Sequence, residues 1–401
     1  MSHIARFNRW SSFMAGHLYA DGRLAGKGGH NVSSRHMLTA RKQAAQNRAA
    51  ARLAEIVAHE VFESHKPADR VVANYFRQHR YLGSRDRRQL AEAVFAMFRW
   101  WGWLTATGWP ERLAEAAALE QSPPADADWS KLLPAWVTPA IRCPRPLEEL
   151  IRWLQRRPPL WLRVQRADPA AVIEALRGAG ITAAAHEELP NALCVHQQVG
   201  NLFLLPVYQA GQVEIQDLAS QRIGAVCAAR PGEQWWDACA GGGGKTLLLA
   251  ETAGRVLATD IREKALAELR RRADRGKFTN ITTRVWDGSA APGEFDGVLV
   301  DAPCTGSGTW RRNPAARWSL TPEDLDTATR RQARLLRVAA TGVKPGGVLV
   351  YATCSLFDRE NRQVVDEFLR ERPEFQLERG VEIWPWDGDC DAMFAARLVR
   401  T

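Results

Sequence analysis

The chain has 401 residues, of which 46% are hydrophobic and 25% are charged. A chain of this length forms two or three domains with full-sized cores, and this composition excludes a wholly disordered or fibrous protein. No run of about 18 apolar residues is present, so we expect no transmembrane helix and no membrane partner.

The positive charge is unevenly distributed along the chain. Lys and Arg number 54 against 45 Asp and Glu, which gives a net charge of +9, and only eight of the cations are Lys. Arg suits phosphate recognition because its planar guanidinium binds two oxygens at once, although a base-composition bias in the gene would give the same excess. Residues 1–50 hold eight cations and one acid. The remainder is nearly neutral, so any nucleic-acid surface there must be a local patch.

The cysteines indicate a reducing compartment. There are seven, an odd number, and no two have the C-x-x-C spacing, which argues against a zinc site or a disulfide framework. The N-terminus lacks the continuous apolar segment of a secretory signal. We therefore expect a cytoplasmic protein without a metal; the Arg-rich, acid-poor start leaves an organelle transit peptide as a minor alternative.

The N-terminal part of the sequence predicts a tail followed by helices. We interpret residues 1–45 as a flexible basic tail and residues 46–145 as a helical domain, because apolar residues recur there at helical spacing. Asp86 and Gln89 have the spacing of a helix cap. Five arginines fall within residues 77–88; they suit phosphate binding and equally suit a solvated helix start.

A second and a third domain follow. Five prolines within residues 121–145 predict a hinge, and residues 150–205 fit a small α/β subdomain with a strand at 159–164 and a helix at 169–176. Residues 206–401 alternate strands and helices, the pattern of a Rossmann-like, mostly parallel, doubly wound sheet. The expected strands are Gln234–Cys239, Arg255–Asp260, Thr283–Trp286, Gly297–Asp301, Val348–Thr353 and Met393–Val399, with helices such as Arg262–Arg275 and Asp324–Val338 between them.

A glycine-rich segment follows the first of these strands. The run Asp237-Ala-Cys-Ala-Gly-Gly-Gly-Gly-Lys-Thr246 lets a backbone pass close to a ligand before a helix begins. It matches neither common phosphate motif, because Cys239 and Thr246 stand where a P-loop and a dinucleotide loop need glycine. We therefore expect a different nucleotide-like ligand. Asp260, at the end of the next strand, is placed to accept ribose hydroxyls. Asp287, after the third, suits an adenine amino group, or simply a turn before Gly288.

Two cysteines end strands that should be neighbours in such a sheet. Cys304 follows Asp301-Ala-Pro, and Cys354 stands between Thr353 and Ser355, 50 residues later. Most cysteines of this kind are buried and inert, but the presence of two thiols at the ends of adjacent strands favours a catalytic role for the pair. A thiolate is a strong nucleophile once its pKa is lowered. A thiol redox enzyme would use the same pair, but the C-x-x-C spacing is missing.

These segments resemble the motifs of S-adenosylmethionine-dependent RNA cytosine-5 methyltransferases of the RsmB/Sun family. The resemblance is dense over 206–401, weaker over 150–205, and faint over 46–120, where it is to a NusB-like RNA-binding domain. Two positions depart from the family pattern: Gly242 replaces a usual Pro, which makes the cofactor loop more flexible, and Gln165 replaces a usual Asn. The matching segments are Ile215–Gln221, Cys239–Thr246, Asp301–Cys304, Trp310–Pro314, Val343–Gly347, Thr353–Ser355 and Glu360–Asn361.

The resemblance implies a role for each matched residue. Cys354 would attack carbon 6 of a cytosine, Asp301 with Lys245 would hydrogen-bond the ring nitrogen, and Cys304 would remove the carbon-5 proton or help release the product. The target base would have to leave its stack to reach them. The residues implied to bind S-adenosylmethionine are Cys239, Ala240, Gly241, Gly242, Gly243, Gly244, Lys245, Asp260, Arg262, Asp287 and Asp301. Those implied to bind RNA are Arg163, Arg311, Arg312 and Asn313.

The sequence therefore predicts a monomeric RNA 5-methylcytosine methyltransferase. Asn313-Pro314 after two arginines, together with the NusB-like region, favours ribosomal RNA as the partner, and transfer RNA is the second candidate. A non-catalytic RNA-binding ribosome-assembly factor of the same fold is the alternative class. Loss of Cys354 or Asp301 would favour that alternative, and both residues are present.

Overall fold

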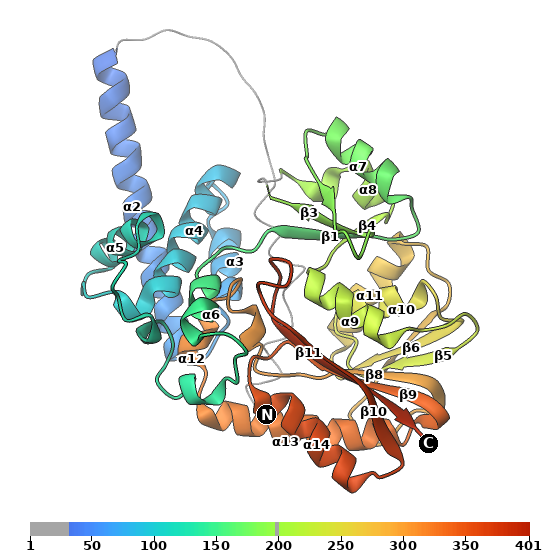
Figure 1. The fold of residues 1–401 in the computed structure, drawn as a ribbon. Coiled ribbons are helices and arrows are strands. Elements are labelled where there is room, and N and C mark those ends of the chain that lie inside the picture. The colour runs from blue at the N-terminus through green and yellow to red at the C-terminus, as the bar shows by residue number, and fades with distance from the viewer. Residues whose placement is uncertain (1–31, 197–199) are drawn as a thin grey trace.

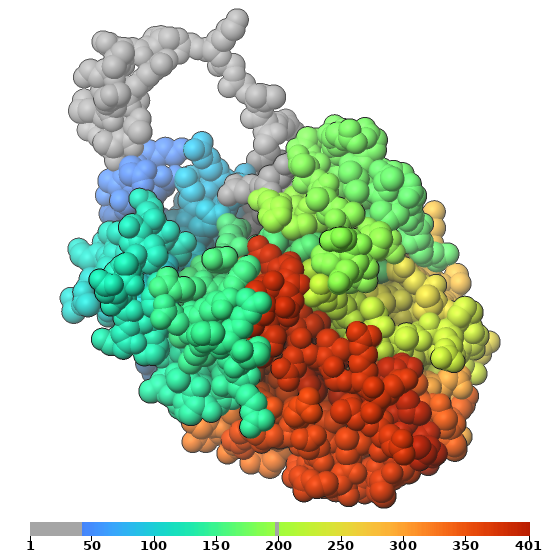
Figure 2. Space-filling model, viewed as in Figure 1, coloured from blue at the N-terminus to red at the C-terminus, as the bar shows by residue number. Residues whose placement is uncertain are grey.

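The computed structural model describes residues 32–196 and 200–401, with side chains from residue 42 onward. Three units follow one another along the chain: a helical region, a four-stranded sheet and a seven-stranded sheet (Figure 1). In the space-filling view, the helical region (blue to teal) and the four-stranded sheet (green) both lie against the C-terminal residues (red) (Figure 2). Within the described ranges, no helix is long and apolar enough to cross a membrane.

The helical region begins earlier than the sequence suggested. Residues 32–45, predicted as tail, belong to the first helix, whereas residues 1–31 lie outside the described part. The predicted cap at Asp86 is wrong: the helix starts at Ser84 after Gly83, and Asp86 instead accepts a hydrogen bond from Gln46 Nε2 at 2.7 Å. The helices are α2 (Val32–Phe62), α3 (Ala68–Gln78), α4 (Ser84–Trp100), α5 (Trp109–Gln121) and α6 (Leu147–Leu154).

The proline-rich segment is packed and does not form an open hinge. Its short 3₁₀ turns, Trp129–Leu132 and Thr138–Ala140, carry side chains into the hydrophobic core of the helical region, where Trp129 and Leu132 are buried. Proline restricts the backbone but does not prevent burial of its neighbours. The segment therefore adds to the core between the helices and the rest of the molecule.

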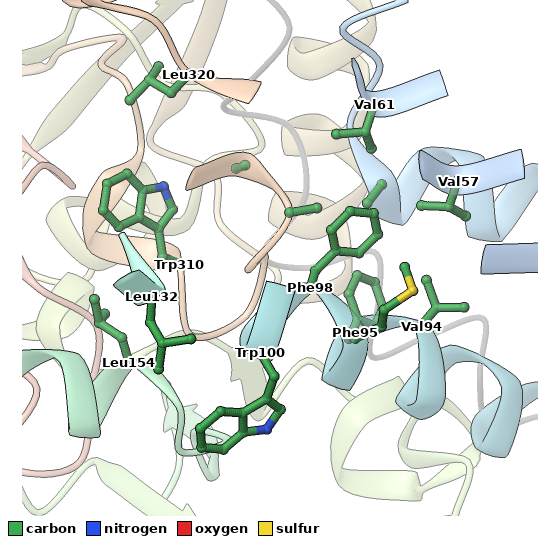
Figure 3. Close-up of a cluster of buried hydrophobic side chains, with 14 of the residues drawn as sticks. Val57, Val61, Val94, Phe95, Phe98, Trp100, Leu132, Leu154, Trp310 and Leu320 are labelled. Carbon is green, nitrogen blue, oxygen red and sulfur yellow. The ribbon is translucent and has the colours of Figure 1, made fainter. Parts of the chain in front are cut away.

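That core is shared with the C-terminal unit. Trp310 and Leu320, which follow Cys304 in the chain, lie in the same cluster as Phe98 and Leu132 (Figure 3). Trp310 is fully buried, and Trp318 Nε1 donates to the Phe98 carbonyl at 2.7 Å. Apolar burial of this kind contributes about 25 cal/mol per Å², so the helical region is docked firmly next to the cysteine strands.

The four-stranded sheet is antiparallel in every pair and has the order β2-β3-β1-β4. Its fourth strand lies beyond residue 205, so this unit extends past the predicted boundary of the small subdomain. Asp168 caps α7 by accepting from Ala170 and Ala171 N–H groups. The elements are β1 (Leu160–Val164), α7 (Pro169–Gly178), β2 (Ala184–Ala185), β3 (Ala192–Val195), α8 (Pro206–Gln209) and β4 (Val213–Ile215).

The seven-stranded sheet has the order β10-β11-β9-β8-β5-β6-β7. The pairs from β9 to β7 are parallel, and β11 and β10 add an antiparallel edge. This confirms the predicted α/β, Rossmann-like class and the predicted adjacency of the two cysteine strands. The strands are β5 (Gln234–Asp237), β6 (Arg255–Asp260), β7 (Ile281–Val285), β8 (Phe295–Asp301), β9 (Val343–Thr353), β10 (Phe375–Ile383) and β11 (Met393–Arg400).

Helices cover both faces of this sheet (Figure 1). Neighbouring residues Trp235 and Trp236 of β5 point to opposite faces, and each is buried in a separate cluster. One face packs against α9, α10 and α11, and the other against α13 and α14. The helices are α9 (Leu218–Cys227), α10 (Gly244–Ala250), α11 (Glu263–Arg275), α12 (Ala316–Ser319), α13 (Pro322–Ala340) and α14 (Arg362–Glu371).

Candidate active site

The carboxyl ends of β5, β6, β8 and β9 open into one cleft. Residues of α3, α4, β1 and β3 also line it, so its walls come from all three units. Its volume is about 2160 Å³, whereas pockets for small molecules measure about 300–1,000 Å³. The cleft therefore has room for a cofactor together with part of a polymer.

The two predicted cysteines meet in this cleft. Their Sγ atoms lie 3.4 Å apart, because β8 and β9 are parallel neighbours and each cysteine follows its strand. Cys354 is half-buried and lines the cleft, whereas Cys304 is 1% exposed. The hydrogen bond to Cys354 and burial raise the pKa of Cys304 well above its usual value. Cys304 is therefore a thiol at neutral pH, and Cys354 is the sulfur that a substrate can reach.

A carboxylate and an ammonium group lie in the same cleft. Lys245 Nζ donates to Asp301 Oδ2 at 2.8 Å. Burial alone would lower the pKa of Lys245, but the Asp301 carboxylate outweighs it and raises that pKa. The pair, formed between the first turn of α10 and the last residue of β8, presents hydrogen-bonding groups to the cleft.

A buried glutamate ties the two cysteine loops together, and the sequence analysis assigned it no role. Glu360 Oε1 accepts from the backbone N–H of Thr305 (2.9 Å) and from Gln332 Nε2 (2.8 Å). Its Oε2 accepts from the hydroxyls of Thr305 (2.5 Å) and Ser355. Thr305 follows Cys304 and Ser355 follows Cys354, so one carboxylate sets the distance between the thiols. The only sequence signal was the Glu360-Asn361 pair, which shows no chemistry by itself.

The glycine loop forms a backbone cradle at the end of β5. Gly241 and Gly243 have φ of +56° and +86°, values that glycine adopts at no steric cost. Gly241 N–H donates to Asp260 Oδ2 at 3.0 Å. Gly243 was predicted to bind the cofactor, but it is buried, and a Cβ there would lie 2.4 Å from Leu269 Cγ. Its role is therefore close packing against α11.

Asp260 is already fully occupied in this structure. Its Oδ1 accepts from Arg262 N and Nε, and its Oδ2 accepts from Gly241 N and Arg262 Nη2, all at 2.8–3.0 Å. A carboxylate has about four acceptor sites. Ribose hydroxyls can bind Asp260 only when the Arg262 guanidinium moves away from this carboxylate or shares one of its oxygens with them.

The other predicted cofactor residues line the cleft, namely Cys239, Ala240, Gly242 and Gly244. Asp287 also lines it, and its Oδ1 accepts from Ser289 N–H at 2.9 Å. Asp287 thus forms the turn before Gly288 that the sequence offered as the alternative to adenine binding, and it also faces the cleft. Among the described residues, no group of three or more His, Cys, Asp or Glu side chains is placed to hold a metal ion.

Two of the four predicted RNA-binding residues are buried. Arg163 is 2% exposed and donates to Gln216 and Gln165. Arg311 is 1% exposed and donates to the carbonyls of Arg156 and Cys390. Both guanidiniums hold parts of the fold together through these hydrogen bonds, although Arg311 also lines the cleft.

The other two remain at the cleft. Arg312 pairs with Asp391, which leaves its side chain 29% exposed. Asn313 lines the cleft, and its Oδ1 is buried without a hydrogen-bond partner. Gln165, the second departure from the family pattern, bridges Arg163 and the Gly211 carbonyl. Gln165 therefore has a structural role in the four-stranded sheet and its surroundings.

Comparisons with known proteins agree with this architecture. Residues 225–399 match the family model "16S rRNA methyltransferase RsmB/F", and residues 133–200 match the ferredoxin-like domain of RsmF/B-like methyltransferases. Ribosomal RNA small subunit methyltransferase B of Proteus mirabilis is 33% identical over 278 residues, which cover 67% of this chain and 65% of that one. The Yersinia pseudotuberculosis protein of the same name is 32% identical over 287 residues, 67% and 66% of the two chains. The chain thus spans slightly less than two thirds of these relatives.

Solved structures share the fold. The crystal structure of PH0851 has a TM-score of 0.74 at 24% identity and covers 88% of this chain and 98% of its own. NSun6 from Pyrococcus horikoshii, solved with SFG, has a TM-score of 0.58 at 18% identity and covers 63% and 93%.

The parallel sheet, the glycine loop after its first strand and the acid after its second define the Rossmann-like fold of the methyltransferases whose cofactor is S-adenosylmethionine. The left-handed glycine backbone and the acid beside it fit that cofactor. The matches over residues 133–200 and 225–399 place these two parts of the chain in the RsmB/F methyltransferase family.

Proposed function

We propose that the protein is an S-adenosylmethionine-dependent ribosomal RNA (cytosine-5) methyltransferase. The observation that carries this proposal is the pair of thiols 3.4 Å apart at the tips of β8 and β9, beside the Lys245–Asp301 pair. Carbon 5 of cytosine is a poor nucleophile until a nucleophile has added at carbon 6. Cys354 is a thiol that the base can reach and that can add to carbon 6, and the Lys245–Asp301 pair can hydrogen-bond the base during this addition.

In the first step, the Cys354 thiolate adds to carbon 6 of the flipped base and forms a carbon–sulfur bond. The electron pair of the carbon 5–carbon 6 double bond moves toward ring nitrogen 3, to which Asp301 donates a hydrogen bond after taking a proton from Lys245. Lys245, 2.8 Å from Asp301, holds that carboxyl in place. Preorganised groups of this kind stabilise developing charge without reorganisation.

In the following steps, carbon 5 becomes nucleophilic and is methylated. S-adenosylmethionine supplies an electrophilic methyl group on sulfur. Once Cys354 has become a thioether on the base, 3.4 Å from Cys304 Sγ, Cys304 no longer faces a second ionisable sulfur and gives its proton to solvent. As a thiolate it takes the proton from carbon 5, the double bond re-forms, and Cys354 leaves as a thiolate.

The RNA lies in the large cleft in this proposal. Three arginines of one helix line it, Arg330, Arg331 and Arg334, which we call the α13 arginines. Arg330 and Arg334 are exposed, and within the described residues none of the three forms an ion pair closer than 4.0 Å. Arg77 of α3 also lines the cleft. These side chains replace Arg163 and Arg311 as the phosphate contacts we propose.

Ribosomal RNA is the proposed substrate because the relatives from Proteus mirabilis and Yersinia pseudotuberculosis are named as ribosomal RNA small subunit methyltransferases. Transfer RNA stays the second candidate. Bisulfite sequencing of ribosomal and transfer RNA, with and without the gene, tests both. We expect one ribosomal cytosine to lose its protection in the deletion strain and to regain it with the wild-type gene but not with a Cys354→Ala gene. Protection that survives the deletion would contradict the proposal.

A further inference from the structure

The four-glycine cofactor loop is held by a side chain from α11. Arg272 Nη1 donates to the carbonyl oxygen of Gly242 at 2.5 Å. Gly241 and Gly243, on either side, both have left-handed φ values, and glycine loses more backbone freedom on ordering than any other residue. A loop of this composition depends on external contacts for a fixed shape.

Arg272 is itself fixed from the four-stranded sheet. Its Nε and Nη2 lie 3.1 and 3.0 Å from Oε2 of Glu214 on β4. The two side chains are 4% and 3% exposed, so this pair is shielded from water and salt. The planar guanidinium can hold Glu214 with one edge and donate to the loop with its remaining nitrogen. The position of the Gly242 carbonyl therefore depends on a residue of a different sheet.

We propose that Arg272 is a positioning residue for cofactor binding, and that Glu214 holds it in place. The four-stranded sheet thereby sets the shape of the loop that binds S-adenosylmethionine. This inference rests on the cofactor assignment, which binding of S-adenosylhomocysteine to the wild-type protein tests separately.

Arg275 provides a matched control. It lies one turn further along α11, pairs with the other oxygen of Glu214 and donates to the Tyr208 hydroxyl at 2.9 Å. It makes no hydrogen bond with the glycine loop in the described structure. Loss of Arg275 weakens the contact between the two sheets as loss of Arg272 does, but it leaves the Gly242 carbonyl bound.

The experiment is calorimetric titration of the full-length protein with S-adenosylhomocysteine. We expect Arg272→Met to raise the dissociation constant about tenfold, the effect of losing one hydrogen bond to a charged group, and Arg275→Met to raise it less than about threefold. Arg272→Lys keeps the charge near Glu214 but loses the fork, so it should bind as weakly as Arg272→Met. Arg272→Lys replaces Arg272→Met as the test if the methionine variant does not fold, and thermal melting shows whether each variant is folded.

A second substitution tests whether Arg272 acts by positioning the glycine loop or by contacting the cofactor itself. Gly242, unlike its neighbours Gly241 and Gly243, does not have the left-handed φ that would exclude proline, and proline would stiffen the loop covalently. Gly242→Pro in the Arg272→Lys background should recover most of the lost affinity. Equal losses in the Arg272 and Arg275 variants, or no recovery with proline, would overturn the inference. Absence of binding to the wild-type protein would overturn the cofactor assignment as well.

Discussion

Replacing Glu360 with Ala should separate the two catalytic loops. The carboxylate is fully buried and accepts four hydrogen bonds, two from N–H groups and two from hydroxyls. After its removal, the hydroxyls of Thr305 and Ser355 can turn to Ser307 Oγ, 3.4 and 3.1 Å away. Gln332 still donates to the Pro303 carbonyl at 3.1 Å. The Thr305 backbone N–H alone is left without a partner.

The expected cost follows from these contacts. One stranded buried N–H costs about 1–3 kcal/mol, and the cavity left by the side chain adds to it, so we expect a loss of about 2–4 kcal/mol in the free energy of unfolding. Release of the loops moves Cys304 and Cys354 relative to each other, and a displacement of about 1 Å costs roughly a hundredfold in rate.

Glu360→Gln is the control for this prediction. A glutamine oxygen at the Oε1 position keeps both N–H bonds, and its amide nitrogen at the Oε2 position can donate to the two hydroxyls. We expect it to lose less than about 1 kcal/mol and to keep most of its activity. Urea unfolding and single-turnover methylation measure the two effects. If Glu360→Gln were as damaging as Glu360→Ala, or if Glu360→Ala kept its turnover rate, the assigned role would be wrong.

Three further outcomes are expected. Burial raises the pKa of Asp237 to about 7, so the contribution of its protonated carboxyl to stability is complete below the ordinary pKa of an aspartate and is lost as the pH rises through 7. Urea unfolding should therefore show the free energy of unfolding of the wild type falling relative to that of Asp237→Asn between pH 4 and 7. Equal pH dependence of the two proteins would refute this. Arg262→Ala frees Asp260 for ribose hydroxyls, so titration should show tighter S-adenosylhomocysteine binding, and weaker binding would mean that Arg262 contacts the cofactor. Replacing the α13 arginines with Gln should lower the slope of RNA affinity against salt by about 2, whereas Arg370→Gln, on an exposed position of α14, should leave the slope unchanged.

Much of the fold was accessible from the sequence because its signals are local. The strand containing Trp235 and Trp236 is a short apolar run bounded by turn residues, and the acids and cysteines that follow such strands mark the carboxyl edge of a parallel sheet. β10 (Phe375–Ile383) was missed because four of its nine residues are polar or charged, a fifth is glycine, and its middle is exposed. It is an edge strand with only β11 beside it, so the alternation of apolar residues is weak.

The features of the site that the sequence did not show have a common physical origin. The sequence shows that Arg163 and Arg311 are cationic, but not that other side chains and carbonyls far along the chain surround them. Arg163 bonds to Gln216, 53 residues away, and Arg311 to the Cys390 carbonyl, 79 residues away. Glu360 was overlooked for the same reason, since its partner Thr305 lies 55 residues earlier. Burial and long-range pairing decide these roles, and neither has a local pattern.

The most direct test of the thiol mechanism compares Cys304→Ala with Cys354→Ala in the presence of substrate RNA and S-adenosylmethionine. Cys304 acts after methyl transfer, so Cys304→Ala should stay covalently bound to its RNA as a slowly migrating band on a denaturing gel. The band should survive boiling in detergent, disappear with RNase and require the cofactor. Cys354→Ala should form no such band and no product, and Cys390→Ala, a buried cysteine outside the cleft, should behave like the wild type. A band from Cys354→Ala, or unchanged methylation in both cleft variants, would contradict the account.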